Sequence, residues 1–181
     1  DIGAGAAKEV VGDLTVVAAT DGNHGRSVAW AARKAGCLCR IYIHHGVSEG
    51  RRRALEDLGA IVTRTTGDYD DSVRVCERDA TAHGWQVVSD TSYPGYDQIP
   101  RDVMAGYGLM VKEIFTQLPQ PLTHMIFQAG VGGLAAALAA RFWIECGAKK
   151  PQLIVVETDR APSLLESARL GKLQAFSIVE E

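Results

Sequence analysis

The residues best suited to chemistry form one six-residue segment, Thr20-Asp21-Gly22-Asn23-His24-Gly25. Gly22 and Gly25 allow the backbone to approach a planar ligand closely, because neither carries a Cβ atom. The Asn23 amide can donate or accept a hydrogen bond at the edge of such a ligand. The segment follows an apolar run and precedes an amphipathic one. It therefore predicts a ligand-binding turn at the carboxyl end of a parallel strand, where open α/β sheets keep their sites.

A second candidate site is the glycine-rich segment Gly130-Val131-Gly132-Gly133-Leu134, which follows Gln128. Three glycines can expose backbone N–H groups at a helix N-terminus, and such an arrangement binds phosphate. The five alanines between Ala135 and Ala140 would let the following helix pack closely on a sheet. A tight strand-to-helix turn without a ligand is the alternative, and the polar Gln128 favours phosphate binding.

The same glycines also fit a dinucleotide fingerprint, Gly130-x-Gly132-x-x-Ala135, with Glu157 as a candidate ribose-binding acid in the next strand. This pattern predicts an NAD-binding dehydrogenase domain or a non-catalytic binding module. It leaves the Thr20–Gly25 turn without a role, however. A ligand that has both a planar ring and a phosphate would use both segments at once.

Asp90 lies in a third polar segment, which runs from Val88 to Tyr96 after another strand candidate. At the carboxyl ends of parallel strands, Asp90 and Asp21 would both open toward a crevice between two lobes. Aspartate is also common in turns, where it caps the local backbone. For Asp90, composition leaves both interpretations open. We expect Tyr96 and Tyr107 to be walls of the core or of a substrate pocket.

The remaining polar groups indicate less. His24 is expected to orient the first turn, with a ligand contact possible, whereas His44-His45 is interpreted as a solvated strand end. The run Arg51–Arg53 opens a helix that also holds acidic residues, and it is interpreted as a solvated face. No pair of histidines has the spacing of a helical zinc site with a carboxylate, so no metal is predicted.

Apolar, β-branched runs alternate with helical patterns along the chain. Strands are expected at 14–19, 39–43, 61–65, 86–89, 123–128 and 153–157, and helices at 24–35, 48–58, 69–82, 100–117, 133–146 and 162–170. Continuous apolar strands separated by helices predict an α/β fold with an open parallel sheet in three αβα layers. We expect a small lobe at 1–98 with the Asn23 turn, and the start of a large lobe at 99–181 with the glycine loop.

Composition limits the partners of the 181-residue chain. A hydrophobic content of 46% is sufficient for a sizeable core, and a net charge of −3 gives no basic surface for nucleic acid or an anionic membrane. No apolar run is long enough to span a bilayer, and no signal sequence opens the chain. The four cysteines are interpreted as reduced thiols of a cytoplasmic protein.

Taken in order, these motifs resemble those of fold-type II pyridoxal phosphate (PLP) enzymes. The family's S/T-x-G-N-H-G/A and G-x-G-G-L elements match the Asn23 turn and the loop Gly130–Leu134. Because Asp21 precedes Gly-Asn-His-Gly, the chain specifically resembles the diaminopropionate ammonia-lyase family, from about Leu14 to at least Phe176. The resemblance implies a two-lobed fold with PLP as cofactor, its phenolic oxygen bonded by Asn23 and its phosphate held by the glycine loop.

The resemblance also implies a reaction, the α,β-elimination of 2,3-diaminopropionate to pyruvate and ammonia in amino-acid catabolism. In that family a small amino acid is the substrate, the enzyme is a homodimer, and two aspartates lie on opposite faces of the substrate's α-carbon. The matching residues are Asp21, which we assign to the D-isomer, and Asp90, which we assign to the L-isomer. Thr20, His24 and Tyr96 are expected to line the substrate pocket.

The chain departs from the family at the Schiff-base lysine, which the family carries in a Phe-Lys context well before the Asn turn. Lys8 is the only lysine before Asp21, and its context is different. We therefore interpret the chain as a fragment with an incomplete large lobe, and we expect activity only from the parent enzyme. A threonine/serine dehydratase or a cysteine synthase is the alternative within this fold. Those groups usually carry Ser or Thr at the position of Asp21.

Overall fold

The computed structural model describes residues 11–174, so Lys8 lies outside the described part. The chain divides into two compact units between Ser89 and Asp90. The first unit contains a sheet of four parallel strands in the order β3-β2-β1-β4, which confirms the predicted parallel sheet. The strands are β1 (Thr15–Ala19), β2 (Leu38–Ile43), β3 (Ile61–Arg64) and β4 (Gln86–Val87).

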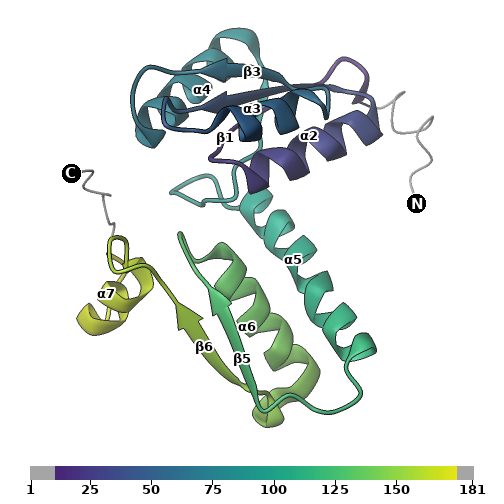
Figure 1. The fold of residues 1–181 in the computed structure, drawn as a ribbon, viewed down its shortest axis with the longest axis vertical. Helices are drawn as coiled ribbons and strands as arrows, with labels where there is room; N and C mark the ends of the chain where they lie inside the picture. Colours follow the sequence, from purple (N-terminus) through teal and green to yellow (C-terminus); the bar gives the residue numbers. More distant parts are fainter. Residues whose placement is uncertain (1–10, 175–181) are drawn as a thin grey trace. The chain divides into compact units, whose positions relative to one another are not determined.

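Helices cover both faces of this sheet, as the continuous apolar strands predict. The helices are α2 (Asn23–Ala35), α3 (Glu49–Glu56) and α4 (Tyr69–His83) (Figure 1). Ala29 of α2 and Leu55 of α3 pack with Ile41 on one face. On the other face, Cys76 of α4 packs with Tyr42. Since Ile41 and Tyr42 are consecutive, their side chains point to opposite faces, and the unit has three αβα layers.

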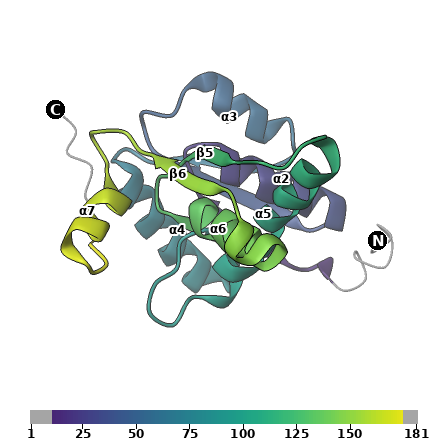
Figure 2. The same ribbon diagram turned by 90° about the horizontal axis from the view of Figure 1, so that it is seen from below.

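The second unit contains two parallel strands, in register from His124 beside Gln152 to Gln128 beside Val156. Its elements are α5 (Gln98–Gln117), β5 (His124–Gln128), α6 (Gly133–Cys146), the short 3-10 helix η1 (Gly147–Lys149), β6 (Gln152–Val156) and α7 (Ser163–Leu170). Helix α6 lies along the two strands, and α7 follows β6 (Figure 2). The core of the unit joins Phe127 to Phe142.

One face of the second sheet carries exposed apolar side chains. Ile126 is 64% exposed, and Val156, which lies two residues beyond its strand partner, is 52% exposed. Parallel sheets in α/β proteins are covered on both faces, so the described part of this unit is a partial domain. The lobe boundary expected between residues 98 and 99 stays a prediction for the intact protein. Among the described residues, no helix is long and apolar enough to cross a membrane.

Candidate functional site

The turn between β1 and α2 is held together by the hydroxyl group of Thr20. Its Oγ1 accepts hydrogen bonds from the backbone N–H groups of Gly22 and Gly25, at 3.0 and 3.2 Å. Thr20 is only 5% exposed, so this hydroxyl satisfies buried donors that would otherwise be unpaired. The backbone therefore uses the polar group of Thr20, and its expected role in a substrate pocket stays a prediction.

Two glycines of this turn are required for different reasons. Gly22 has a φ of +155°, a conformation that other residues rarely adopt. Gly25 is confined by packing, because a Cβ atom there would overlap the methyl group of Thr20 and lie 3.2 Å from Leu55. Close packing thus lets α2 begin at Asn23, with only three residues between it and the last residue of β1.

Asn23 and His24 form the first turn of α2. Asn23 is the first residue of the helix, and its side chain is exposed. The Nε2 atom of His24 lies 2.7 Å from the carbonyl oxygen of Val88, just after β4. His24 therefore ties the turn to the neighbouring strand, as expected for an orienting residue.

Asp21 has a partner that the sequence did not suggest. Its Oδ1 atom lies 3.2 Å from Nε2 of His44, whose side chain is only 17% exposed. The interpretation of His44 as a solvated residue was therefore wrong. The parallel register explains the contact: Ala19 lies beside Tyr42, so the residues two positions further on, Asp21 and His44, also lie side by side. Extending the register would have revealed the pair.

Arg51 also reaches this turn, although its side chain is exposed as expected. Its Nη1 atom donates to the carbonyl oxygen of Asp21 at 3.3 Å. The stem of the same side chain would lie 3.5 Å from a Cβ atom at Gly22. Arg51 therefore supports the backbone of the turn from the first turn of α3.

The glycine loop leads into α6 without any side-chain cap. Gly132 is the residue before the helix and has a φ of +92°, which favours glycine. A Cβ atom at Gly132 would lie 3.2 Å from Leu164, whereas one at Gly130 would meet nothing within 4 Å. An N-terminus without a side-chain cap leaves its first N–H groups available to an anion. The loop therefore fits a phosphate group.

Asp90 lies beside this loop within the second unit. A Cβ atom at Gly133 would be 3.4 Å from the carbonyl oxygen of Asp90. Burial raises the pKa of the Tyr107 phenol, and the charge of Asp90 contributes in the same direction. The structure thus brings together Asp90, the glycine loop and Tyr107. Tyr96 stacks on Tyr93, with ring centroids 4.8 Å apart.

The predicted residues are divided between the two units, and each group is well defined in its own unit. Asp21 and Asn23 belong to the first unit, whereas Asp90 and the loop Gly130–Leu134 belong to the second. The expectation that Asn23 and the loop face each other across one crevice therefore stays a prediction.

Glu157 has hydrogen-bond partners that the dinucleotide interpretation did not predict. Its two carboxylate oxygens accept the backbone N–H groups of Leu164 and Leu165, each at 2.9 Å. The dinucleotide interpretation assigns this carboxylate to the hydroxyl groups of a ribose. Instead, Glu157 fixes the start of α7, from which Leu164 contacts the loop at Gly132.

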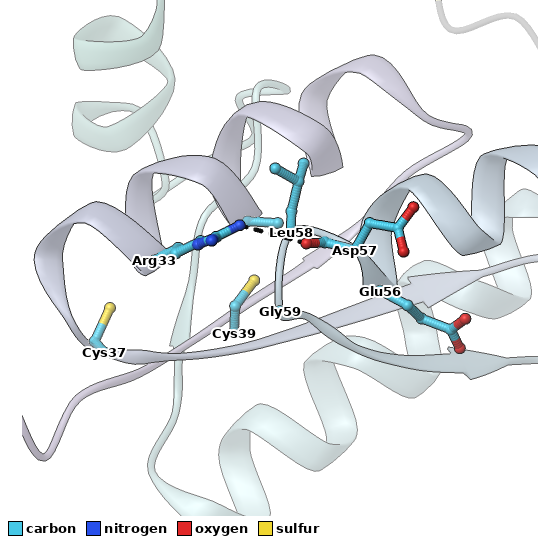
Figure 3. Close-up of a pocket in the computed structure, with 8 residues that line it drawn as sticks. Arg33, Cys37, Cys39, Glu56, Asp57, Leu58 and Gly59 are labelled. Atoms are coloured by element: carbon cyan, nitrogen blue, oxygen red, sulfur yellow. Dashed lines mark hydrogen bonds between the residues drawn. The ribbon is translucent and has the colours of Figure 1, made fainter.

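A cavity of about 250 Å³ lies at the C-terminal end of α2, whereas Asp21 and Asn23 lie at the other end of this helix. Its lining includes Arg33, Cys37 and Cys39, and Arg33 donates to the carbonyl oxygen of Asp57 at 3.4 Å (Figure 3). None of the predicted site residues contributes to this lining. Within residues 11–174, no group of three or more His, Cys, Asp or Glu side chains is arranged to hold a metal ion.

The chain is similar to curated and solved diaminopropionate ammonia-lyases. It is 41% identical over 165 residues to the enzyme from Salmonella typhimurium, covering 89% of this chain and 41% of that protein. A crystal structure of holo diaminopropionate ammonia lyase from Escherichia coli superposes with a TM-score of 0.88 at 36% identity, covering 92% of this chain and 43% of the other. The chain thus spans less than half the length of these relatives.

A dehydratase is a more distant relative. The biosynthetic threonine dehydratase of Arabidopsis thaliana is 29% identical over 157 residues, covering 87% of this chain and 25% of that protein. The higher identity to the ammonia-lyases than to the dehydratase agrees with the presence of Asp21 ahead of Gly-Asn-His-Gly. Residues 2–180 match the family model described as pyridoxal-phosphate dependent enzyme, and the chain therefore belongs to this family.

Proposed function

We propose that the chain is part of a diaminopropionate ammonia-lyase, a carbon–nitrogen lyase that converts 2,3-diaminopropionate to pyruvate and ammonia. The observation that carries the proposal is Asp21, which stands at the carboxyl end of β1 directly ahead of Gly22 and Asn23. The 41% identity to the Salmonella enzyme supports the same assignment. Because the chain spans 41% of that relative, we assign the activity to a longer protein that supplies the Schiff-base lysine.

The two turns would bind different parts of PLP. We assign the ring edge to Asn23, whose exposed amide begins α2. The phosphate is assigned to the backbone N–H groups of the loop Gly130-Val131-Gly132-Gly133-Leu134, where no side chain caps α6. When bound, PLP supplies the sink for the electron pair that the substrate's α-carbon releases. The protein supplies orientation and proton transfer.

Proton transfer at the α-carbon is assigned to the two carboxylates. Asp21 would take the proton from the D-isomer of the substrate, and Asp90 from the L-isomer. Thr20, His24 and Tyr96 would contribute to the walls of the substrate pocket. Two bases on opposite faces would allow one enzyme to use both stereoisomers.

We further propose that the full-length protein is a cytoplasmic homodimer. The four cysteines are all free, which is typical of proteins in reducing compartments and supports the cytoplasmic assignment. The dimer rests on the resemblance to the family. Sedimentation equilibrium of the full-length protein would test it, because a monomeric mass would exclude the dimer.

Stereoisomer-resolved kinetics of the full-length protein test the proposed function. Asp21→Asn and Asp90→Asn should each lower the release of pyruvate from opposite isomers, by about 10²–10⁴-fold, because a carboxamide keeps the size but cannot take the proton. Asp70→Asn, on the exposed face of α4, is the matched control. Equal losses on both isomers would exclude the two-base assignment. Faster turnover of serine or threonine than of 2,3-diaminopropionate would favour the dehydratase alternative.

A further inference from the structure

The protonation pattern of His44 is set by the backbone that follows it. The N–H group of Gly46 donates to Nδ1 of His44 at 3.2 Å. A backbone N–H can only donate, so Nδ1 must be the acceptor and the ring proton must reside on Nε2. Nε2 lies 3.2 Å from Oδ1 of Asp21 and therefore donates to that carboxylate.

Glycine is needed at position 46 for this arrangement. A Cβ atom there would lie 2.9 Å from Cε1 and 3.3 Å from Nδ1 of the His44 ring. Any side chain at Gly46 would therefore displace the imidazole. The tautomer and the ring position of His44 depend on the same short segment.

Arg64 holds this segment in place from β3. Its Nη1 atom donates to the carbonyl oxygens of His44, His45 and Val47 at 3.3, 2.8 and 2.6 Å. Its Nη2 atom pairs with Glu49 at 2.6 Å, at the start of α3. Several bonds to one guanidinium fix the backbone, and the His44 ring is oriented before any substrate arrives.

We infer that His44 is a positioning residue for Asp21, an inference that rests on the proposed function. The neutral imidazole holds Oδ1, and Arg51 holds the backbone carbonyl of the same residue at 3.3 Å. Oδ2 then takes the proton from the substrate. The side chain of Asp21 is 58% exposed, so its pairing with His44 contributes little to folding. The effect of the pairing should therefore appear in turnover of the D-isomer, from which Asp21 takes the proton.

Kinetics of the full-length enzyme with both stereoisomers test the inference. His44→Ala should lower kcat for the D-isomer about three- to tenfold, the loss expected for one partly exposed hydrogen bond, with KM little changed. Turnover of the L-isomer should stay the same. His44→Gln, whose amide can still donate, should recover most of the loss. His124→Ala, at an exposed strand end, is the matched control.

A second measurement does not depend on activity. Nitrogen-15 spectra of the histidine-labelled full-length protein should show His44 with the proton on Nε2 and none on Nδ1. A proton on Nδ1 would overturn the inference. Equal losses on both isomers in His44→Ala, or no loss on the D-isomer while Asp21→Asn abolishes it, would overturn the inference and leave the proposed function standing. If Asp21→Asn spares the D-isomer, both fail.

Discussion

The turn after β1 and the loop after β5 both lead from a parallel strand into a helix, but they are stabilised in different ways. In the turn, the Thr20 hydroxyl accepts hydrogen bonds from two backbone N–H groups. In the loop, no side chain caps α6, and the neighbours of the glycines are Leu164 and the carbonyl of Asp90. Where a turn presents side chains to a ligand, its backbone N–H groups can bond to a side chain of the same turn. A loop that offers its donors to a ligand, as we propose for Gly130–Leu134, has to be held by packing instead.

The largest effect should follow from adding a Cβ atom at Gly25. Gly25→Ala should lower the free energy of unfolding by about 1–3 kcal/mol, because the new methyl group would overlap the methyl of Thr20 in a buried site. Urea titration of the full-length protein measures the loss. Gly50→Ala in α3, where a Cβ atom meets nothing within 4 Å, is the control.

Thr20→Ser distinguishes the methyl of Thr20 from its hydroxyl. Serine keeps the oxygen that accepts from Gly22 and Gly25 but removes the overlapping methyl. The double variant Gly25→Ala/Thr20→Ser should therefore be more stable than Gly25→Ala alone. An unchanged or lower stability would show that the methyl overlap is not the cause.

The second prediction concerns the conformation of the glycine loop. Gly132→Ala should lower the free energy of unfolding by about 1–2 kcal/mol, because its φ of +92° disfavours a side chain. Gly130→Ala should be tolerated, since neither its conformation nor its surroundings exclude a Cβ atom. The comparison uses the same urea titration. Equal losses in the two variants would contradict a special role for Gly132.

The third prediction tests the support that α7 gives to the loop. Glu157→Gln should lower the free energy of α7 opening by about 0.5–1.5 kcal/mol, because one N–H group of Leu164 or Leu165 loses a charged acceptor. Hydrogen exchange at these two amides should become faster. Glu166→Gln, which removes a carboxylate paired with Arg169 on the same helix, is the control. The same acceleration in both variants would exclude a specific cap.

The smallest effect near neutral pH concerns two buried thiols, Cys39 of β2 and Cys76 of α4. Burial raises the pKa of the Cys39 and Cys76 thiols to about 12, from an ordinary value of 9.0. The folded state holds these protons more tightly than the unfolded state. Their contribution to the free energy of unfolding is therefore complete below pH 9 and is lost as the pH rises toward 12.

Unfolding midpoints in urea between pH 7 and pH 11 measure this loss. The double variant Cys39→Ala/Cys76→Ala should show a shallower decline above about pH 9 than the unmodified protein. Cys146→Ala, in the second unit, is the control. Parallel declines in all three proteins would show that buried thiols do not contribute.

Most elements were predictable because their signals are local. Helix α6 has the bounds that were expected, since Gly132 and Gly147 delimit an apolar, alanine-rich run. Strand β4 is shorter than expected and covers only Gln86–Val87, because its pairing with β1 involves only two residues. Pairing depends on the neighbour, which periodicity along one segment does not describe.

Contacts between distant residues could not be predicted in the same way. The pairing of Asp21 with His44 depends on the register of two strands. The hydrogen bonds from Arg64 to the backbone after His44 depend on a long side chain that comes from a third strand. Glu157 was correctly placed at a strand end, but its partners in α7 come seven and eight residues later. Motif spacing identified the candidate residues and could not identify what holds them.

Our central claim is that the first turn binds the ring of PLP and the glycine loop binds its phosphate. Dissociation constants of PLP and of pyridoxal, which lacks the phosphate, test this claim in the full-length apoenzyme. Gly132→Ala should weaken PLP binding and reduce the preference for PLP over pyridoxal. Asn23→Ala should weaken both ligands by a similar factor and move the absorbance band to shorter wavelength. If both variants changed the preference for PLP over pyridoxal equally, the assignment of the ring to the first turn and of the phosphate to the loop would be contradicted.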